Sequence, residues 1–233
     1  TSAGGKGANQ AVAAASLCIA PVTMVCKVGN DAFGESLLRN FQRVGVDYDT
    51  EACTTKEAHT GVAPIIVSTV TGDNCIIVIP GANHVLTKDE VRTAIESKKP
   101  SVVICQLEIL PDVALEAMKA GKDVGAITIL NPAPAPQGWT LEEFYSFVDI
   151  LTPNESELRN LCGGGDDEEA MARKLLAKGI GQAVVVTLGS RGALIVTKEE
   201  SLLVQQPSDL PCKNDPVIDT IGAGDSFCGA LSC

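Results

Sequence analysis

The chain has 233 residues, enough for one large domain, and its 45% apolar and 20% charged content is ordinary for a soluble globular protein. The excess of 29 acidic over 18 basic residues gives a net charge of -11, which argues against nucleic acid and anionic membranes as main partners. A nucleotide stays open as a ligand, because backbone N–H groups alone can build a phosphate site. Nine scattered cysteines without a Cys-x-x-Cys pair predict reduced core thiols in an intracellular protein.

Short apolar segments alternate with helical patterns along most of the chain. A strand expected at 22–25 precedes an amphipathic helix at 31–44, with Asp31 as its predicted N-cap and Gly45 just after its last turn. Further strands are expected at 101–106, 126–130, 148–151 and 183–188, and further helices at 111–120, 154–161 and 168–178. This alternation of apolar strands and helices is typical of a mostly parallel sheet with helices on both faces.

Two hairpins interrupt the alternation. The segments 61–68 and 74–79 flank a Thr-Gly-Asp turn at 71–73, and the segments 193–196 and 201–204 flank a second turn at 198–200. The chain shows no internal repeat, and no linker is long enough to separate two independent domains. The sequence therefore predicts one α/β domain over 1–233.

The segment DTIGAGDSF at 219–227 places two glycines, one residue apart, at the predicted start of a helix. Glycine lets the backbone approach a ligand, and the first-turn N–H groups and the helix dipole favour an anion, so the segment predicts a phosphate site. An aspartate repels phosphate, so Asp225 indicates a base that takes a proton from an attacking hydroxyl. The alternative is that Asp225 is only a first-turn partner of the helix dipole.

The segment GGKGANQA at 4–11 leads into a helix expected at 8–17. Lys6 and Asn9 are three residues apart, so they can point to one side of the first turn. An ammonium and an amide together suit the hydroxyl groups of a sugar. The alternative is a flexible start with an ordinary helix cap.

The segment TPNESE at 152–157 follows a predicted strand, and Asn154 and Glu157 lie one turn apart at a helix start. An amide oxygen and a carboxylate could orient the hydrated Mg²⁺ that accompanies ATP. The alternative is a capping arrangement with an exposed acidic face. Glu108, Asn131 and Thr187 also follow or end strands, so we expect these polar loops at one edge of the sheet.

The segments 4–10 and 219–225 resemble the two signatures of the ribokinase-like carbohydrate kinases, and segments at 81–83, 106–108, 131–135, 152–155 and 187–189 resemble that family in the same order. The resemblance covers the entire chain. It implies a three-layer α/β/α sandwich with a mostly parallel sheet and a partial β-sheet lid, of which the hairpin at about 60–80 is one half. It also implies transfer of the γ-phosphoryl of ATP to the 5-hydroxyl of D-ribose, with Mg²⁺ required and K⁺ as activator. Fructose or adenosine as acceptor is the alternative within the family.

The same resemblance implies roles for single residues. Asp225 matches the catalytic base, and the anion hole for the transferred phosphoryl matches Gly222, Ala223 and Gly224. The positions that match sugar contacts are Gly4, Gly5, Lys6, Asn9, Glu108 and Asp225. The positions that match nucleotide or metal contacts are Asn154, Thr187, Gly189 and Gly224 for the nucleotide, Glu157 for Mg²⁺ through water, and Asp219 and Ile221 for K⁺.

Both ends of the sequence look cut against this family, whose members begin earlier and continue further. We therefore expect weak or no activity from the chain as written, and a form that only binds nucleotide or a partner subunit is a further alternative. The resemblance implies a homodimer through the lid, ribose and ATP as small-molecule partners, and no nucleic acid or membrane partner. It implies a cytoplasmic location, with the nucleus as a second compartment.

Overall fold

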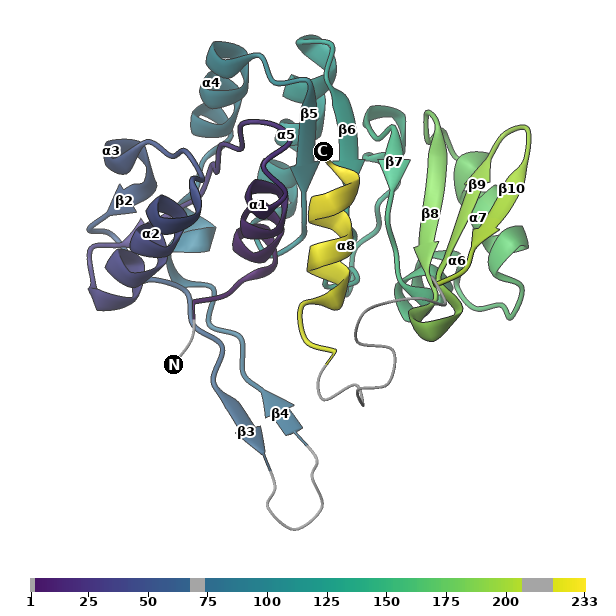
Figure 1. The fold of residues 1–233 in the computed structure, drawn as a ribbon, viewed down its shortest axis with the longest axis horizontal. Coiled ribbons are helices and arrows are strands. Elements are labelled where there is room, and N and C mark those ends of the chain that lie inside the picture. The colour runs from purple at the N-terminus through teal and green to yellow at the C-terminus, as the bar shows by residue number, and fades with distance from the viewer. Residues whose placement is uncertain (1–2, 68–73, 207–219) are drawn as a thin grey trace.

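The computed structural model describes residues 3–67, 74–206 and 220–233, and its centre is a six-stranded sheet (Figure 1). The strand order is β10-β9-β8-β7-β6-β5, with β5 to β8 parallel and β9 and β10 antiparallel. The strands are β5 (Val102–Cys105), β6 (Ile127–Leu130), β7 (Ile150–Leu151), β8 (Ala183–Thr187), β9 (Ala193–Thr197) and β10 (Ser201–Val204). The predicted mostly parallel sheet and the second hairpin are confirmed.

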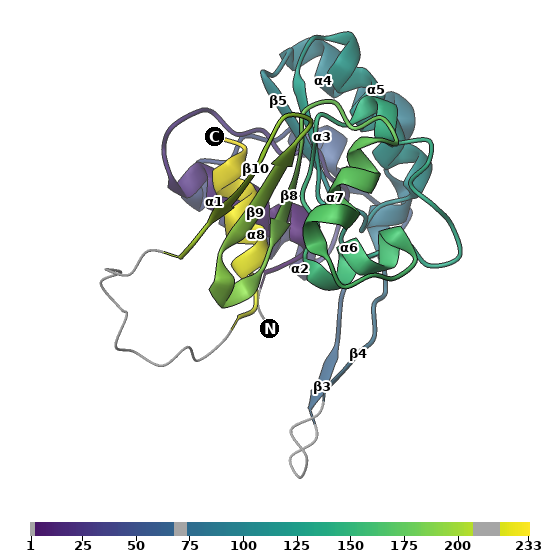
Figure 2. The same ribbon diagram turned by 90° about the vertical axis from the view of Figure 1, so that its right-hand side faces the viewer.

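Helices cover both faces of this sheet, as the side view shows (Figure 2). On one face lie α1 (Lys6–Ser16) and α8 (Ala223–Leu231), and on the other lie α4 (Lys88–Lys98), α5 (Pro111–Asp123), α6 (Glu155–Cys162) and α7 (Glu168–Leu176). Beside α1 lie α2 (Ala32–Val44), α3 (Thr50–Cys53) and the two short parallel strands β1 (Val28–Gly29) and β2 (Thr54–Thr55). Short 3-10 turns are Gly81–Val85, Tyr145–Phe147 and Gly189–Arg191. The layers form the α/β/α sandwich that the sequence predicts.

The main core lies between the sheet and the face covered by α4 to α7. Leu130, Leu151 and Val184 from three adjacent strands are completely buried there, together with Met118 and Leu175 from the helices. Burying each such side chain stabilises the fold by roughly 1.5–3 kcal/mol. This core fixes the positions of the strand ends that lead into the polar loops.

The helix that begins after Asp31 follows the sequence closely. The Asp31 carboxylate accepts hydrogen bonds from the N–H groups of Phe33 and Gly34, and Gly45 ends the helix in the left-handed conformation. The expected strand at 22–25 is wrong, because only Thr23 forms a bridge there, and its partner is Asp47, just before α3. Helix α4 was not anticipated. It starts with a capping box between Thr87 and Glu90.

The first predicted hairpin is present as the antiparallel strands β3 (Ile65–Val67) and β4 (Asn74–Ile76), which project away from the body (Figures 1 and 2). A bridge between Val62 and Ile79 extends the pair toward the body. The turn predicted at 71–73 lies outside the described residues. Within the described ranges, no helix has the length and apolarity needed to cross a bilayer.

Seven of the cysteines have side chains that the structure describes, and all seven are free thiols. Four of them are buried, but Cys18 and Cys233 are exposed and Cys26 is half-buried. The prediction that the cysteines are core residues is therefore wrong for these three.

Candidate active site

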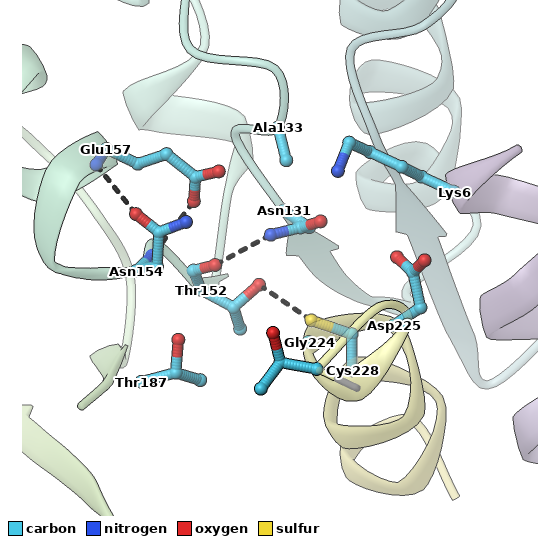
Figure 3. A pocket seen from close by; sticks show the side chains of 12 residues that line it. Lys6, Asn131, Ala133, Thr152, Asn154, Glu157, Thr187, Gly224, Asp225 and Cys228 are labelled. Atoms are coloured by element: carbon cyan, nitrogen blue, oxygen red, sulfur yellow. Dashed lines mark hydrogen bonds between the residues drawn. The ribbon is translucent and has the colours of Figure 1, made fainter. Parts of the chain in front are cut away.

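A pocket of about 210 Å³ opens where the parallel strands end and α1 and α8 begin (Figure 3). Its lining combines strand-end loops with the first turns of these two helices, as expected for an open α/β sheet. The lining residues are Lys6, Asn131, Ala133, Thr152, Asn154, Glu157, Thr187, Thr220, Gly222, Gly224, Asp225 and Cys228. Seven of these were predicted as site residues from the sequence: Lys6, Asn154, Glu157, Thr187, Gly222, Gly224 and Asp225.

The two helices that point at the pocket both begin at a glycine in the left-handed region. Gly5 has φ 98° before α1, and Gly222 has φ 78° before α8, and neither helix has a side-chain cap. A residue with a Cβ would be strained at either position. In α8 no N-cap side chain occupies the first-turn N–H groups, which are left for a ligand, whereas in α1 the Lys6 N–H is taken by Glu108. Of the predicted anion hole, Ala223 already donates its N–H to the Thr220 oxygen at 3.2 Å.

Asp225 lies in the first turn of α8, and α1 holds both of its carboxylate oxygens. Its Oδ2 accepts a hydrogen bond from Asn9 Nδ2 at 2.9 Å, and its Oδ1 accepts one from Gln10 Nε2 at 3.0 Å. A residue that only interacted with the dipole of its own helix would not need these contacts. They come from another helix and fix the carboxylate at the rim of the pocket. A carboxylate held this way can accept a proton from a hydroxyl in the pocket.

Asn154 and Glu157 form a reciprocal capping box at the start of α6. The Asn154 side-chain oxygen accepts from the Glu157 N–H at 2.8 Å, and Glu157 Oε2 accepts from the Asn154 N–H at 2.9 Å. The capping alternative is thus present, and it occupies the amide oxygen that was expected to orient Mg²⁺. Figure 3 shows the amide nitrogen of Asn154 on the pocket side. Burial raises the pKa of Glu157, with the Asp225 charge adding to it and the Asn154 N–H and Lys6 opposing it.

The predicted sugar-contacting residues meet at the start of α1. The Lys6 N–H donates to Glu108 Oε2 at 2.7 Å, and a Cβ at Gly5 would lie 3.6 Å from the same oxygen. Figure 3 shows the Lys6 ammonium reaching toward the pocket. Glu108 therefore fixes the backbone of this turn. Gly4 lies just before it, with open space around its Cβ position.

Four further predicted residues remain, of which only Thr187 lines the pocket. Thr187 ends β8 beside Asn154, with which it forms a parallel bridge, and Gly189 begins the short turn that follows. Ile221 is exposed at the start of α8. Asp219, predicted as a K⁺ ligand, lies outside the described residues.

Several residues at the pocket carried no predicted role. Thr152 Oγ1 lies 3.4 Å from Cys228 Sγ, and both side chains are buried. Burial raises the pKa of the Cys228 thiol, which keeps it neutral. Thr220 lines the opening beside Gly222, and Gln10 reaches Asp225 from a buried position. For Thr152 and Thr220 the only sequence signal was their position within segments already recognised as ligand-binding.

Comparison with known proteins identifies relatives of this chain. The model of the pfkB family carbohydrate kinases matches residues 1–232. Ribokinase of Mus musculus is 39% identical over 236 residues, an alignment that covers 98% of this chain and 70% of the mouse protein. Deoxyribokinase of Salmonella typhi is 37% identical over 238 residues, covering 98% of this chain and 73% of that protein.

A solved structure extends the comparison to the fold. The structure of Arabidopsis thaliana ribokinase complexed with ribose and ATP is 28% identical, with a TM-score of 0.81, and the match covers 98% of this chain and 73% of that one. The predicted ribokinase-like fold is therefore confirmed.

Proposed function

We propose that this chain, which belongs to the pfkB family of carbohydrate kinases, transfers the γ-phosphoryl group of ATP to the 5-hydroxyl of D-ribose. The observation that carries the proposal is the position of Asp225, in the first turn of an uncapped helix and held by two amides of α1. A proton acceptor beside anion-binding N–H groups is what direct transfer to a hydroxyl requires.

Each residue of the pocket has its own role in this transfer. Asp225 takes the proton of the attacking hydroxyl, so that no covalent enzyme intermediate is needed. The N–H groups of Gly222 and Gly224 receive charge from the transferred phosphoryl, and Ala223 contributes once it releases Thr220. Lys6, next to Glu108, contacts the sugar hydroxyls.

The chemistry of the pocket fits a magnesium ion that is held mainly by phosphates and water. Within the described residues, no three His, Cys, Asp or Glu side chains cluster as a protein-made metal cage would. Glu157 lines the pocket with Asp225, and one or two carboxylates suffice for Mg²⁺ bound to a nucleotide. The bound ion would neutralise phosphate charge, and Glu157 would hold its water shell.

The role of K⁺ rests on the family resemblance at Asp219 and Ile221. Turnover measured in K⁺ and in the larger cation tetramethylammonium, at equal ionic strength, tests it. Equal rates would contradict activation by K⁺.

The test of the reaction uses ribose-dependent ATP consumption by the wild-type chain and by Asp225→Asn. We expect the substitution to lower turnover by roughly 100-fold or more while ribose binding stays similar. Asp166→Asn is the matched control, because Asp166 is exposed in a surface loop and the charge change is the same. Turnover of Asp225→Asn near the wild-type rate would show that Asp225 is not the base.

The acceptor is tested in the same assay. Ribose, 2-deoxyribose, fructose and adenosine are compared, because the similar Salmonella protein is named a deoxyribokinase at almost the same identity as the mouse ribokinase. The highest kcat/KM for ribose supports the proposal. Binding of ribose and ATP without turnover would instead support a binding role.

The hairpin is proposed to act as a lid and as the contact surface of a homodimer. Ile65 and Ile66 on one arm and Ile77, Val78 and Ile79 on the other are exposed apolar side chains. An apolar strand pair of this kind is a surface that other chains cover. Light scattering of the wild type and of Ile66→Lys tests it, and a monomer in both would contradict a dimer. A cytoplasmic location stays a prediction, which cell fractionation tests.

A further inference from the structure

Gln10 lies in α1 between the sheet edge and α8, and only 1% of it is exposed. Figure 1 shows α1 and α8 side by side, and a Cβ at Gly229 of α8 would lie 2.6 Å from the Gln10 main-chain oxygen. A buried amide left without partners destabilises the fold. The partners of Gln10 therefore matter for both helices.

Three hydrogen bonds use the whole amide group of Gln10. Its Nε2 donates to Asp225 Oδ1 at 3.0 Å and to Asn131 Oδ1 at 3.1 Å. Its Oε1 accepts from Gln106 Nε2. Gln106 follows β5 and Asn131 follows β6, so Gln10 connects two adjacent strand ends with the first turn of α8.

The hydrogen-bond pattern allows one orientation of these amides. Asn131 donates from Nδ2 to the Thr152 carbonyl oxygen at 2.8 Å, and a carbonyl can only accept. Asn131 must therefore turn its oxygen toward Gln10. Gln10 in turn must present its amino group, which is also the group that a carboxylate at Asp225 needs. Such a fully satisfied network is rigid, because any rotation leaves a buried polar atom without a partner.

We propose, on the basis of the proposed function, that Gln10 is a positioning residue for the base Asp225. It anchors Oδ1 to the sheet edge and so leaves Oδ2 to face the acceptor hydroxyl. Oδ2 contacts Asn9, which is on the side of the predicted sugar contacts. Gln10 does not line the pocket, so it acts on the reaction through the pocket residues that it holds, of which Asp225 is the base and Asn131 is the other.

The test is the effect of Gln10→Leu on kcat and KM in the ribose kinase assay. We expect kcat to fall roughly 10- to 100-fold, because a small misplacement of a reacting group costs this much. The KM values for ribose and ATP should stay within about two-fold, since Gln10 contacts neither. Gln10→Glu keeps the size of the side chain but replaces the amino donor with a carboxylate oxygen that faces Asp225. It therefore tests the same role if Gln10→Leu does not fold. Wild-type kcat in either folded variant, or a parallel rise of KM, would overturn the proposal.

A double-substitution cycle separates positioning from general damage to the fold. In an Asp225→Asn background, Gln10→Leu should change the residual turnover by less than about two-fold, because the group it positions is already gone. The same fold-loss in both backgrounds would overturn the proposal. Gln42→Leu, exposed on α2, is the control that should keep full activity. If Asp225→Asn alone retains turnover, Asp225 is not the base and the proposed mechanism is wrong. Full activity of Gln10→Leu with an inactive Asp225→Asn would instead contradict only the role of Gln10.

Discussion

Asp31 connects the start of α2 with the base of the projecting hairpin, and we expect Asp31→Ala to lower the free energy of unfolding by about 2 kcal/mol. Its Oδ2 accepts from the Thr60 N–H at 2.8 Å, and its Oδ1 accepts from the Gly34 N–H at 2.9 Å and the Phe33 N–H at 3.1 Å. These bonds, that of the Thr60 N–H first, lower the pKa of Asp31 from 3.8 to about 2.

The magnitude follows from this lowered pKa. A shift of almost two units, at about 1.4 kcal/mol per unit, corresponds to about 2 kcal/mol, and the side chain is only 20% exposed, so solvent screening reduces it little. Because the folded-state pKa is the lower one, this stabilisation is present above about pH 4 and is lost as the pH falls toward about 2. The difference between wild type and Asp31→Ala should therefore shrink in acid.

The assay is urea denaturation of both proteins near neutral pH and at about pH 2.5. The matched control is Asp49→Ala, because Asp49 also caps a helix but accepts only from the N–H groups of Glu51 and Ala52 in that helix. We expect this control to cost about 1 kcal/mol. Equal losses in the two variants would refute the reasoning, since the bonds to Thr60 would then contribute nothing.

Three further predictions concern packing, hydrogen bonding and thiols. Gly229→Ala should destabilise the protein by about 1–3 kcal/mol and lower turnover, because its Cβ would lie 2.6 Å from a main-chain oxygen of α1; an unchanged Tm would contradict this. Asp149→Ala should cost about 2–3 kcal/mol in urea denaturation, because the buried Thr128 N–H and hydroxyl lose the carboxylate oxygen to which they donate at 3.0 and 3.1 Å; a loss within experimental error would contradict it. Cys26 and Cys53, whose sulfur atoms are 3.7 Å apart, should form a disulfide with glutathione disulfide while two glutathione thiols are released. The rate should rise as the pH passes about 7, because the hydrogen bond with Cys26 lowers the pKa of Cys53 to about 7; peptide mapping that finds only free thiols would contradict the pair.

The elements that the sequence predicted best are those with local signals at both ends. Asp31 and Gly45 delimit α2 because capping uses atoms within one turn of the helix end. The strand at 22–25 failed because strand formation depends on a partner far away in sequence, and Asp47 offers pairing at one residue only. An apolar run therefore forms a strand only where a pairing partner is also present.

The location of the polar pocket could be predicted, because parallel strands bring their carboxyl ends to one edge of the sheet. The roles of Asn154 and Glu157 could not be settled that way, since a capping box and a metal-orienting pair use the same residue types at the same spacing. In the folded chain the amide oxygen of Asn154 already accepts a hydrogen bond from the Glu157 N–H. Local chemistry and ligand chemistry thus compete for the same atoms at a helix start.

Gln10 shows which sequence signal could have been used and was not. Along α1 the buried residues besides Gln10 are Ala8, Ala11, Ala14 and Ala15, so the helix packs closely through small side chains. One long amide on such a face would be destabilising unless every hydrogen bond were satisfied. A glutamine among buried alanines therefore indicates fixed polar partners across the interface. In this fold the partner that faces the pocket is Asp225, which makes the packing of α1 against α8 a condition for placing the base.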